Sequence, residues 1–161
     1  MISIKVICHG KIKEKSITLL IDEYIKRLSR FCKLQIIELA DEKIPTTEST
    51  GALELVKEKE ANMMLNKLDS YKNAYIICLD ERGKEFSSTE FANNISEISQ
   101  KHSTIIFCIG GSLGLSEKVK NKANLITSFS RLTFPHQLFR VFLLEQIFRS
   151  FKINNNEMYH H

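Results

Sequence analysis

Two short passages in the second half of the chain combine residue types that bind small molecules. Residues 110–114 read Gly-Gly-Ser-Leu-Gly and follow an unbroken apolar run. Glycines at the carboxyl end of a buried strand let a ligand reach backbone N–H groups that no side chain covers. Residues 128–137 leave another short strand and enter a helix, with Ser130 or Thr133 as the predicted N-cap and Pro135 in the first turn. The two passages predict one small-molecule site built mainly from backbone atoms.

Four polar side chains near these passages and at the C-terminus are candidates for chemistry. His136 and Arg140 are one helical turn apart at the start of a predicted helix, so they suit an anionic or polar ligand group. The alternative for His136 is a structural histidine whose ring N–H is bonded to the backbone. Tyr159 and His160 suit stacking on an RNA base and hydrogen bonding to it. The alternative for these two residues is a frayed tail.

Several common catalytic and metal-binding motifs do not occur in the sequence. The glycines of residues 110–114 lack GxGxxG spacing, and Gly83-Lys84 lacks the Ser or Thr that follows in a P-loop. There is no GxSxG or HExxH pattern, so hydrolase chemistry has no support. The four cysteines stand singly, without CxxC or zinc-ligand spacing. We therefore expect reduced core thiols, no bound metal and a cytoplasmic protein.

The elements that must position these residues alternate between strands and helices. Apolar runs predict five strands, and helical spacing of apolar residues predicts a helix after each strand. The predicted strands are residues 2–8, 33–39, 74–79, 105–109 and 125–128, and the main helices are 17–28, 53–68, 88–98 and 136–151, with a short helix after Ser116. This order predicts a single α/β domain over residues 1–161, with a mostly parallel sheet flanked by helices. No apolar run is long enough for a membrane span, and the N-terminus is typical of a strand rather than a signal peptide.

The last predicted helix, residues 136–151, is apolar in nearly every direction. Only His136 and Arg140 on one side and Glu145 and Arg149 on the other interrupt it. A helix of this kind must be covered on more than one face. The sheet covers one face, and in a domain of this size a second copy is a plausible cover for the rest, so we predict a homodimer through this helix. The alternative is a central helix within one chain.

Basic residues indicate a polyanionic partner. The net charge is +4 and the pI about 8.8, values that permit such a partner without demanding it. Lys11, Lys13 and Lys15 follow the first predicted strand, and Arg30 follows the first helix. We predict that these side chains bind RNA phosphates. The alternative is a solvated helix start.

The motifs, taken in order along the chain, resemble the bacterial SPOUT-superfamily RNA methyltransferases. Among these, the chain is similar to the small enzymes of the large ribosomal subunit that methylate N3 of a pseudouridine in 23S rRNA. The similarity runs the length of the chain. It rests on residues 79–84 with 87–88, on 109–114, on 132–137 with Arg140 and 145–146, and on Tyr159-His160. Where those enzymes usually end in Lys or Arg after Tyr-His, this chain has His161.

The resemblance implies a C-terminal trefoil knot, an obligate homodimer and S-adenosylmethionine bound in the knot. The knot is an exception to the rule that chains do not thread their own loops. Ribosomal RNA or the ribosome is the implied partner. By position, the implied cofactor contacts are Leu79, Gly110, Phe129, Ser130, Arg131, Leu132, Thr133 and Phe134.

The implied reaction is methyl transfer to an RNA ring nitrogen, which must lose its proton. The predicted catalytic residues are His136, Arg140, Tyr159 and His160. We favour Arg140 for stabilising charge and the Tyr159–His160 tail for positioning the base, so Arg140→Ala is expected to reduce transfer and largely keep cofactor binding. Two other functions stay open: a nucleotide-dependent oxidoreductase that uses the glycines of residues 110–114, and a non-catalytic ribosome-binding module.

Overall fold

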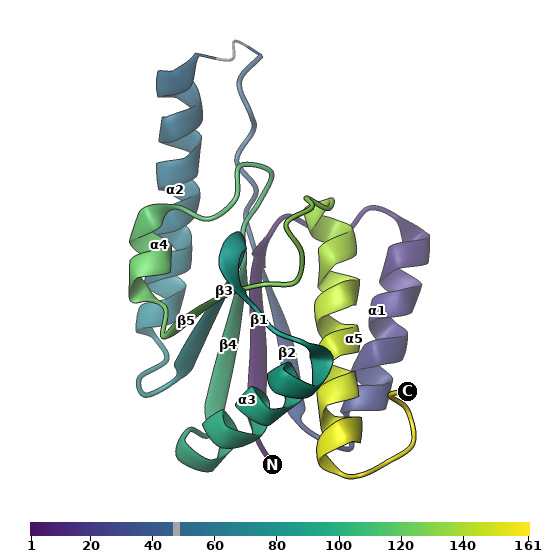
Figure 1. Cartoon of the computed structure of the whole chain (residues 1–161). Helices are drawn as coiled ribbons and strands as arrows, with labels where there is room; N and C mark the ends of the chain where they lie inside the picture. The colour runs from purple at the N-terminus through teal and green to yellow at the C-terminus, as the bar shows by residue number, and fades with distance from the viewer. Residues whose placement is uncertain (47–48) are drawn as a thin grey trace.

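Five strands form one sheet in which all neighbouring strands run parallel, in the order β2-β1-β4-β3-β5 (Figure 1). The computed structural model describes residues 1–46 and 49–161. The strands are β1 (Ser3–His9), β2 (Lys33–Leu39), β3 (Tyr75–Glu85), β4 (Thr104–Ile109) and β5 (Leu125–Ser128). The helices are α1 (Lys15–Leu28), α2 (Thr50–Asp69), α3 (Ser88–Lys101), α4 (Glu117–Lys122) and α5 (His136–Asn154). The predicted α/β fold with a mostly parallel sheet is confirmed.

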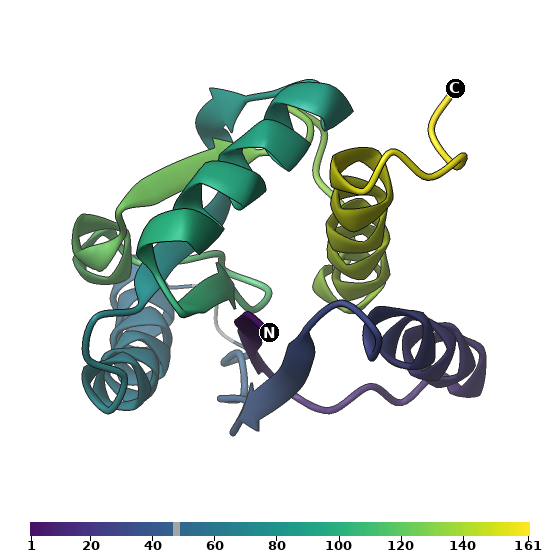
Figure 2. The same cartoon turned by 90° about the horizontal axis from the view of Figure 1, so that it is seen from below.

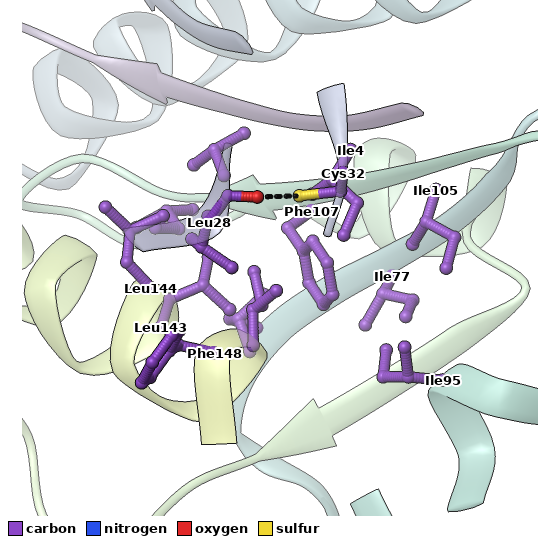
Figure 3. Close-up of a cluster of buried hydrophobic side chains, with 14 of the residues drawn as sticks. Ile4, Leu28, Cys32, Ile77, Ile95, Ile105, Phe107, Leu143, Leu144 and Phe148 are labelled. Atoms are coloured by element: carbon purple, nitrogen blue, oxygen red, sulfur yellow. Dashed lines mark hydrogen bonds between the residues drawn. The ribbon is translucent and has the colours of Figure 1, made fainter. Parts of the chain in front are cut away.

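The helices lie on both faces of the sheet. Helices α1, α3 and α5 cover one face and α2 and α4 the other (Figures 1 and 2). Neighbouring residues of a strand point to opposite faces, so Phe107 packs in one core and Ile106 in the other. Figure 3 shows the first of these cores around Phe107. Burial on both faces explains why β3 and β4 contain apolar runs without alternation, at residues 76–79 and 105–109.

Side-chain caps fix where several helices begin. Ser87 accepts from the backbone N–H of Glu90, whose carboxylate accepts from the N–H of Ser87, so α3 begins with a capping box. The prediction of Ser130 or Thr133 as the cap of α5 is wrong. Pro135 occupies that position with no side-chain cap, and the Ser130 hydroxyl instead accepts from the N–H of Leu132. Because this hydroxyl closes a local turn, residues 129–135 remain a loop at the end of the sheet.

Strand β3 continues beyond the predicted end at Leu79 because it pairs with β5 twice. Both Leu79 and Lys84 lie opposite Thr127, and the residues between them loop out of the pairing. Gly83 lies in this loop against β5. A Cβ atom there would be 2.6 Å from the carbonyl carbon of Thr127, so only glycine fits the close approach of the two backbones.

Helix α5 lies between α1 and α3 and packs against the sheet (Figure 2). One chain therefore buries much of the helix: Arg140, Val141, Leu143, Leu144, Ile147, Phe148 and Ser150. These neighbours supply much of the cover that the sequence analysis assigned to a second copy. Phe142 and, just before the helix, Phe134 keep 37% and 39% of their surface exposed.

The four cysteines are free and buried in the cores. Burial raises the pKa of the Cys8 thiol to about 11 and that of Cys32 to about 12, so both stay protonated and unreactive at neutral pH. Among the described residues, no helix has the length and apolar character needed to cross a membrane.

Candidate active site

A cavity of about 450 Å³ opens at the carboxyl ends of β3, β4 and β5. Three loops that are far apart in the sequence form its wall: residues 79–82, 109–115 and 129–134. Parallel strands end at the same edge of a sheet, and ligands of open α/β sheets bind at this edge. The volume lies in the range of about 300–1,000 Å³ that small-molecule sites occupy.

The glycine loop is shaped so that backbone forms the cavity wall. A Cβ atom on Gly110 would lie 2.4 Å from the carbonyl carbon of Gly114 and 2.7 Å from the nitrogen of Leu115. Gly114 has a φ of 76°, and its N–H donates to the carbonyl of Gly111 at 3.0 Å. A side chain therefore has no room at Gly110 and is strained at Gly114, so this tight turn presents main-chain groups to a ligand.

Most of the predicted cofactor contacts line this one cavity: Leu79, Gly110, Phe129, Ser130, Leu132, Thr133 and Phe134. Arg131 does not. Its side chain is 89% exposed and turns toward Glu85, with its Nε 3.8 Å from a carboxylate oxygen. Its neighbours Ser130 and Leu132 line the cavity, whereas Arg131 faces solvent. Contact of these residues with a cofactor stays a prediction.

The cavity wall also contains charged side chains that the sequence analysis did not select. Lys120 from α4 pairs with Asp80 at 3.2 Å and with Glu117 at 2.8 Å. Burial opposes ionisation of Asp80, but the N–H of Arg82 and the charge of Lys120 lower its pKa below its usual value. Asp80 is the first residue after a buried apolar run, a signal the sequence contains, whereas Lys120 reaches the site only through packing of α4.

His136 is the one predicted catalytic residue that lines the cavity. Its Nε2 atom is buried and has no hydrogen-bond partner among the described residues. Burial, and next the charge of Arg140, lower the pKa of His136. The ring is therefore neutral at neutral pH.

This lowered pKa predicts a pH dependence of stability. The unfolded chain binds a proton at the ordinary histidine pKa, and the folded chain binds it only at lower pH. The contribution of His136 is therefore fully present above the ordinary pKa and is lost as pH falls through the folded pKa. Relative to His136→Gln, the native free energy of unfolding should increase from about pH 5 to about pH 7.5, measured by urea denaturation. A difference that is constant with pH would contradict the assignment.

Arg140 lies behind the cavity rather than in it. The side chain is only 1% exposed. Its guanidinium donates to the carbonyls of His9 and Gly10 at 2.8 and 2.7 Å and to the carboxylate of Glu38 at 2.8 Å. The sequence analysis placed this charge toward the ligand, but in the fold it joins α5 to the ends of β1 and β2. Its predicted role in transfer is untested by this geometry.

The C-terminal tail folds back onto α5, away from the cavity of the same chain. The hydroxyl of Tyr159 donates to Glu145 at 3.1 Å, and His160 lies 3.2 Å from the guanidinium of Arg149. Burial and the Glu145 charge raise the pKa of Tyr159 to about 12, so the phenol is protonated. Glu145 is about 14 Å along the helix axis from His136. Within one chain, the predicted catalytic residues are thus not brought together.

The predicted RNA-binding residues fall into two places. Lys11, Lys13 and Lys15 are exposed on the loop from β1 to α1, near the cavity end of the sheet. Arg30 lies beyond the other end of α1, about 20 Å away along that helix, and its guanidinium pairs with Glu157 at 2.6 Å. In residues 1–46 and 49–161, no cluster of three or more His, Cys, Asp or Glu side chains is arranged to hold a metal.

Comparison with known proteins decides the family. The model of the family described as "Predicted SPOUT methyltransferase" matches residues 2–160. This chain belongs to the SPOUT methyltransferase family.

Several relatives match almost the whole SPOUT chain. Proteins named "Ribosomal RNA large subunit methyltransferase H" from Clostridium botulinum (strain Kyoto / Type A2) and Clostridium novyi (strain NT) are each 52% identical to it over 159 residues. The protein of the same name from Clostridioides difficile (strain 630) is 49% identical over 159 residues. Each alignment covers 98% of this chain and 99% of the relative.

A solved structure has a similar fold. A probable methylase family protein from Haemophilus influenzae Rd KW20 superposes with a TM-score of 0.56 at 11% identity, covering 98% of this chain and 70% of that one. At that identity, the likeness concerns the fold alone. As a SPOUT methyltransferase, the chain is an enzyme that requires a methyl donor.

Proposed function

We propose that this SPOUT enzyme transfers a methyl group from S-adenosylmethionine to N3 of a pseudouridine in 23S rRNA of the large ribosomal subunit. The observation that carries the proposal is the near-complete alignment at about half identity with ribosomal RNA large subunit methyltransferases H. The cavity formed by the glycine loop and residues 129–134 supports it. Because the substrate is ribosomal, the cytoplasm is the proposed place of action.

The residues of the cavity fit S-adenosylmethionine. The backbone cradle around Gly110 suits adenine and ribose hydrogen bonds, and Leu79, Phe129 and Leu132 provide apolar surface. When bound, the cofactor supplies a methyl group that a positively charged sulfur already activates. The acidic side chain of Asp80 at the cavity wall suits this positive charge.

The protein must position the pseudouridine and accept its N3 proton. His136 suits the second task because its ring is neutral and its Nε2 is without a partner in the described part of the chain. The protonated Tyr159 is a poor base and suits hydrogen bonding to the nucleotide. Arg140 and His160 complete the proposed set, the first by stabilising charge and the second by contacting RNA beside Arg149.

We propose that the SPOUT chain forms a single domain with a C-terminal trefoil knot and acts as a homodimer through α5. Leu79 and Lys84 of β3 both pair with Thr127, and the residues between them leave the pairing. This irregular crossing of β3 and β5 supports the proposed knot. A second hollow of about 290 Å³ between α3 and α5 supports the dimer, because exposed Phe134 and Phe142 border it. The tail of one chain contacts Glu145, about 14 Å along α5 from the chain's own His136, so a composite site is consistent with the dimer. Sedimentation equilibrium of native protein and of Phe142→Glu tests it.

Phosphate binding by the exposed lysines gives a measurable salt dependence. We expect the triple variant Lys11→Gln, Lys13→Gln, Lys15→Gln to weaken binding to ribosomal particles. It should also lower the slope of log affinity against log salt by about 0.7–0.9 per lost phosphate contact. Filter binding at several salt concentrations measures the slope. The matched control is Lys59→Gln with Lys118→Gln, two exposed lysines on the opposite face of the sheet. An unchanged slope in the triple variant would remove these lysines from the RNA interface.

The test of the function is incubation with radiolabelled S-adenosylmethionine and separated ribosomal particles from a strain that lacks the modification, followed by mapping of the modified base. We expect label at N3 of a single 23S pseudouridine. Label elsewhere would overturn the proposed substrate. Cofactor binding without transfer to any particle would instead favour a non-catalytic ribosome-binding module. The oxidoreductase alternative is not favoured by the family match.

A further inference from the structure

A buried carboxylate lies directly behind the glycine loop. Glu60 is on α2, is only 6% exposed, and does not line the cavity. A Cβ atom on Gly111 would come within 3.1 Å of one of its carboxylate oxygens and 3.3 Å of the other. Gly111 has no positive φ, so its backbone conformation alone does not require glycine. The carboxylate occupies the space that a side chain at position 111 would need.

The surroundings hold this carboxylate in place. The N–H of Glu42 approaches one of its oxygens at 3.5 Å, and Nδ1 of His9 lies 3.9 Å from the same oxygen. His9 is itself fixed, because Nδ1 is 3.0 Å from the carbonyl of Ala40, which only accepts, so this nitrogen carries the proton. The loop after β2, the end of β1 and helix α2 therefore meet behind Gly111.

A second carboxylate repeats the arrangement on the neighbouring strand. A Cβ atom on Gly10 would lie 3.0 Å from a carboxylate oxygen of Asp41. The carbonyl of Gly10 also accepts from Arg140. Burial raises the pKa of Glu60, while its neighbour His9 and the backbone N–H of Glu42 oppose the shift. Burying a carboxyl group lowers the stability of the fold unless the group is hydrogen-bonded or paired. A role that only fills space would therefore be unfavourable.

We propose that Glu60 is a positioning residue that holds the glycine loop, residues 110–114, in its cofactor-binding shape from behind. This inference rests on the proposed function, because it assigns S-adenosylmethionine to the cavity in front of that loop. Glu60 touches no substrate. It acts through Gly111, which lines the cavity on its other side.

The test combines replacements of Glu60 and Gly111 and measures S-adenosylmethionine binding by calorimetry. Glu60→Ala should raise the Kd about tenfold, and Glu60→Gln, which keeps the shape, less. Gly111→Ala should also raise the Kd about tenfold in the native background. In the Glu60→Ala background, Gly111→Ala should change the Kd less than about threefold, because the space behind the loop is then free.

In transfer assays, Glu60→Ala should raise KM for the cofactor and leave kcat nearly unchanged.

The matched control is Glu58→Ala. This glutamate is on the same helix but exposed, and it pairs with Lys118 at 2.9 Å, so its replacement should leave the Kd unchanged. Equal effects of Gly111→Ala in both backgrounds, or native affinity in both Glu60 variants, would overturn the assignment. The free energies of unfolding of the native protein, the two single variants and the double variant are also compared by thermal unfolding without cofactor. Absence of cofactor binding by the native protein would overturn the proposed function, whereas the unfolding cycle would still decide whether Glu60 and Gly111 are coupled.

Discussion

Gly110→Ala should abolish detectable S-adenosylmethionine binding and lower the free energy of unfolding by about 3 kcal/mol. The added Cβ would lie 2.4 and 2.8 Å from the carbonyl carbon and Cα of Gly114, and these are backbone atoms that no rotamer change can move. The loop must then open at the point where three cavity-forming segments meet. Overpacking of this kind is relieved only by shifting the backbone that forms the cavity wall.

The measurement is calorimetry with S-adenosylmethionine, together with urea unfolding of the same samples. Gly51→Ala is the matched control, because a Cβ atom at Gly51 meets nothing within 4 Å in the first turn of α2. That variant should keep native affinity and gain roughly 0.5–1 kcal/mol from helix propensity. A Gly110→Ala protein that binds the cofactor with native affinity would exclude the glycine loop from the cofactor site.

Arg140→Met should lower the free energy of unfolding by about 3 kcal/mol. The replacement leaves the buried carbonyls of His9 and Gly10 without their charged donor and Glu38 without its partner. The loss falls at the lower end of the range for buried pairs because Glu38 is 36% exposed and keeps access to water. Arg140→Lys should recover only part of the loss, since an ammonium keeps the charge but cannot place its donors as the planar fork of a guanidinium does.

Urea unfolding measures both variants, with Arg27→Met as the control. Arg27 pairs with Glu23 at 3.0 Å on the exposed side of α1, and its loss should change stability by less than about 1 kcal/mol. A small effect of Arg140→Met would contradict the buried network.

The Arg140→Lys variant also separates the structural from the catalytic role of this residue. Transfer is measured at saturating cofactor and is expressed per folded molecule. Undiminished transfer would mean that Arg140 acts only by joining α5 to the ends of β1 and β2, and would remove it from charge stabilisation. Reduced transfer with native cofactor affinity would support the role that the sequence analysis favoured.

Local patterns predicted the secondary structure because the relevant interactions are close in sequence. The capping box at Ser87 and Glu90 and the apolar run before Gly110 each lie within a few residues. The cap of α5 was predicted wrongly for the same reason. Ser130 has the chemistry of a cap, but its hydroxyl is used by a turn that depends on how residues 129–135 cross the end of the sheet.

The side chains with long-range partners were the least predictable. Arg140 and His136 look alike in the sequence, as polar residues one turn apart on a helix. The fold gives Arg140 three acceptors at the ends of β1 and β2, and it leaves the buried Nε2 of His136 without a partner in the described part of the chain. Glu60, in a charge-rich helix, had no signal at all that distinguished it from its exposed neighbour Glu58.

The amino-acid sequence by itself determined the α/β class, the positions of the strands, the backbone-lined loops and the family, because each depends on short-range patterns or on residue identity along the chain. Only the tertiary structure decided which charged side chains face the cavity and which are buried behind it. It also decided which glycines lie against a carboxylate. The physical reason is that burial and pairing energies depend on distances between residues that are separated by tens of positions, and only the packed sheet and helices fix those distances.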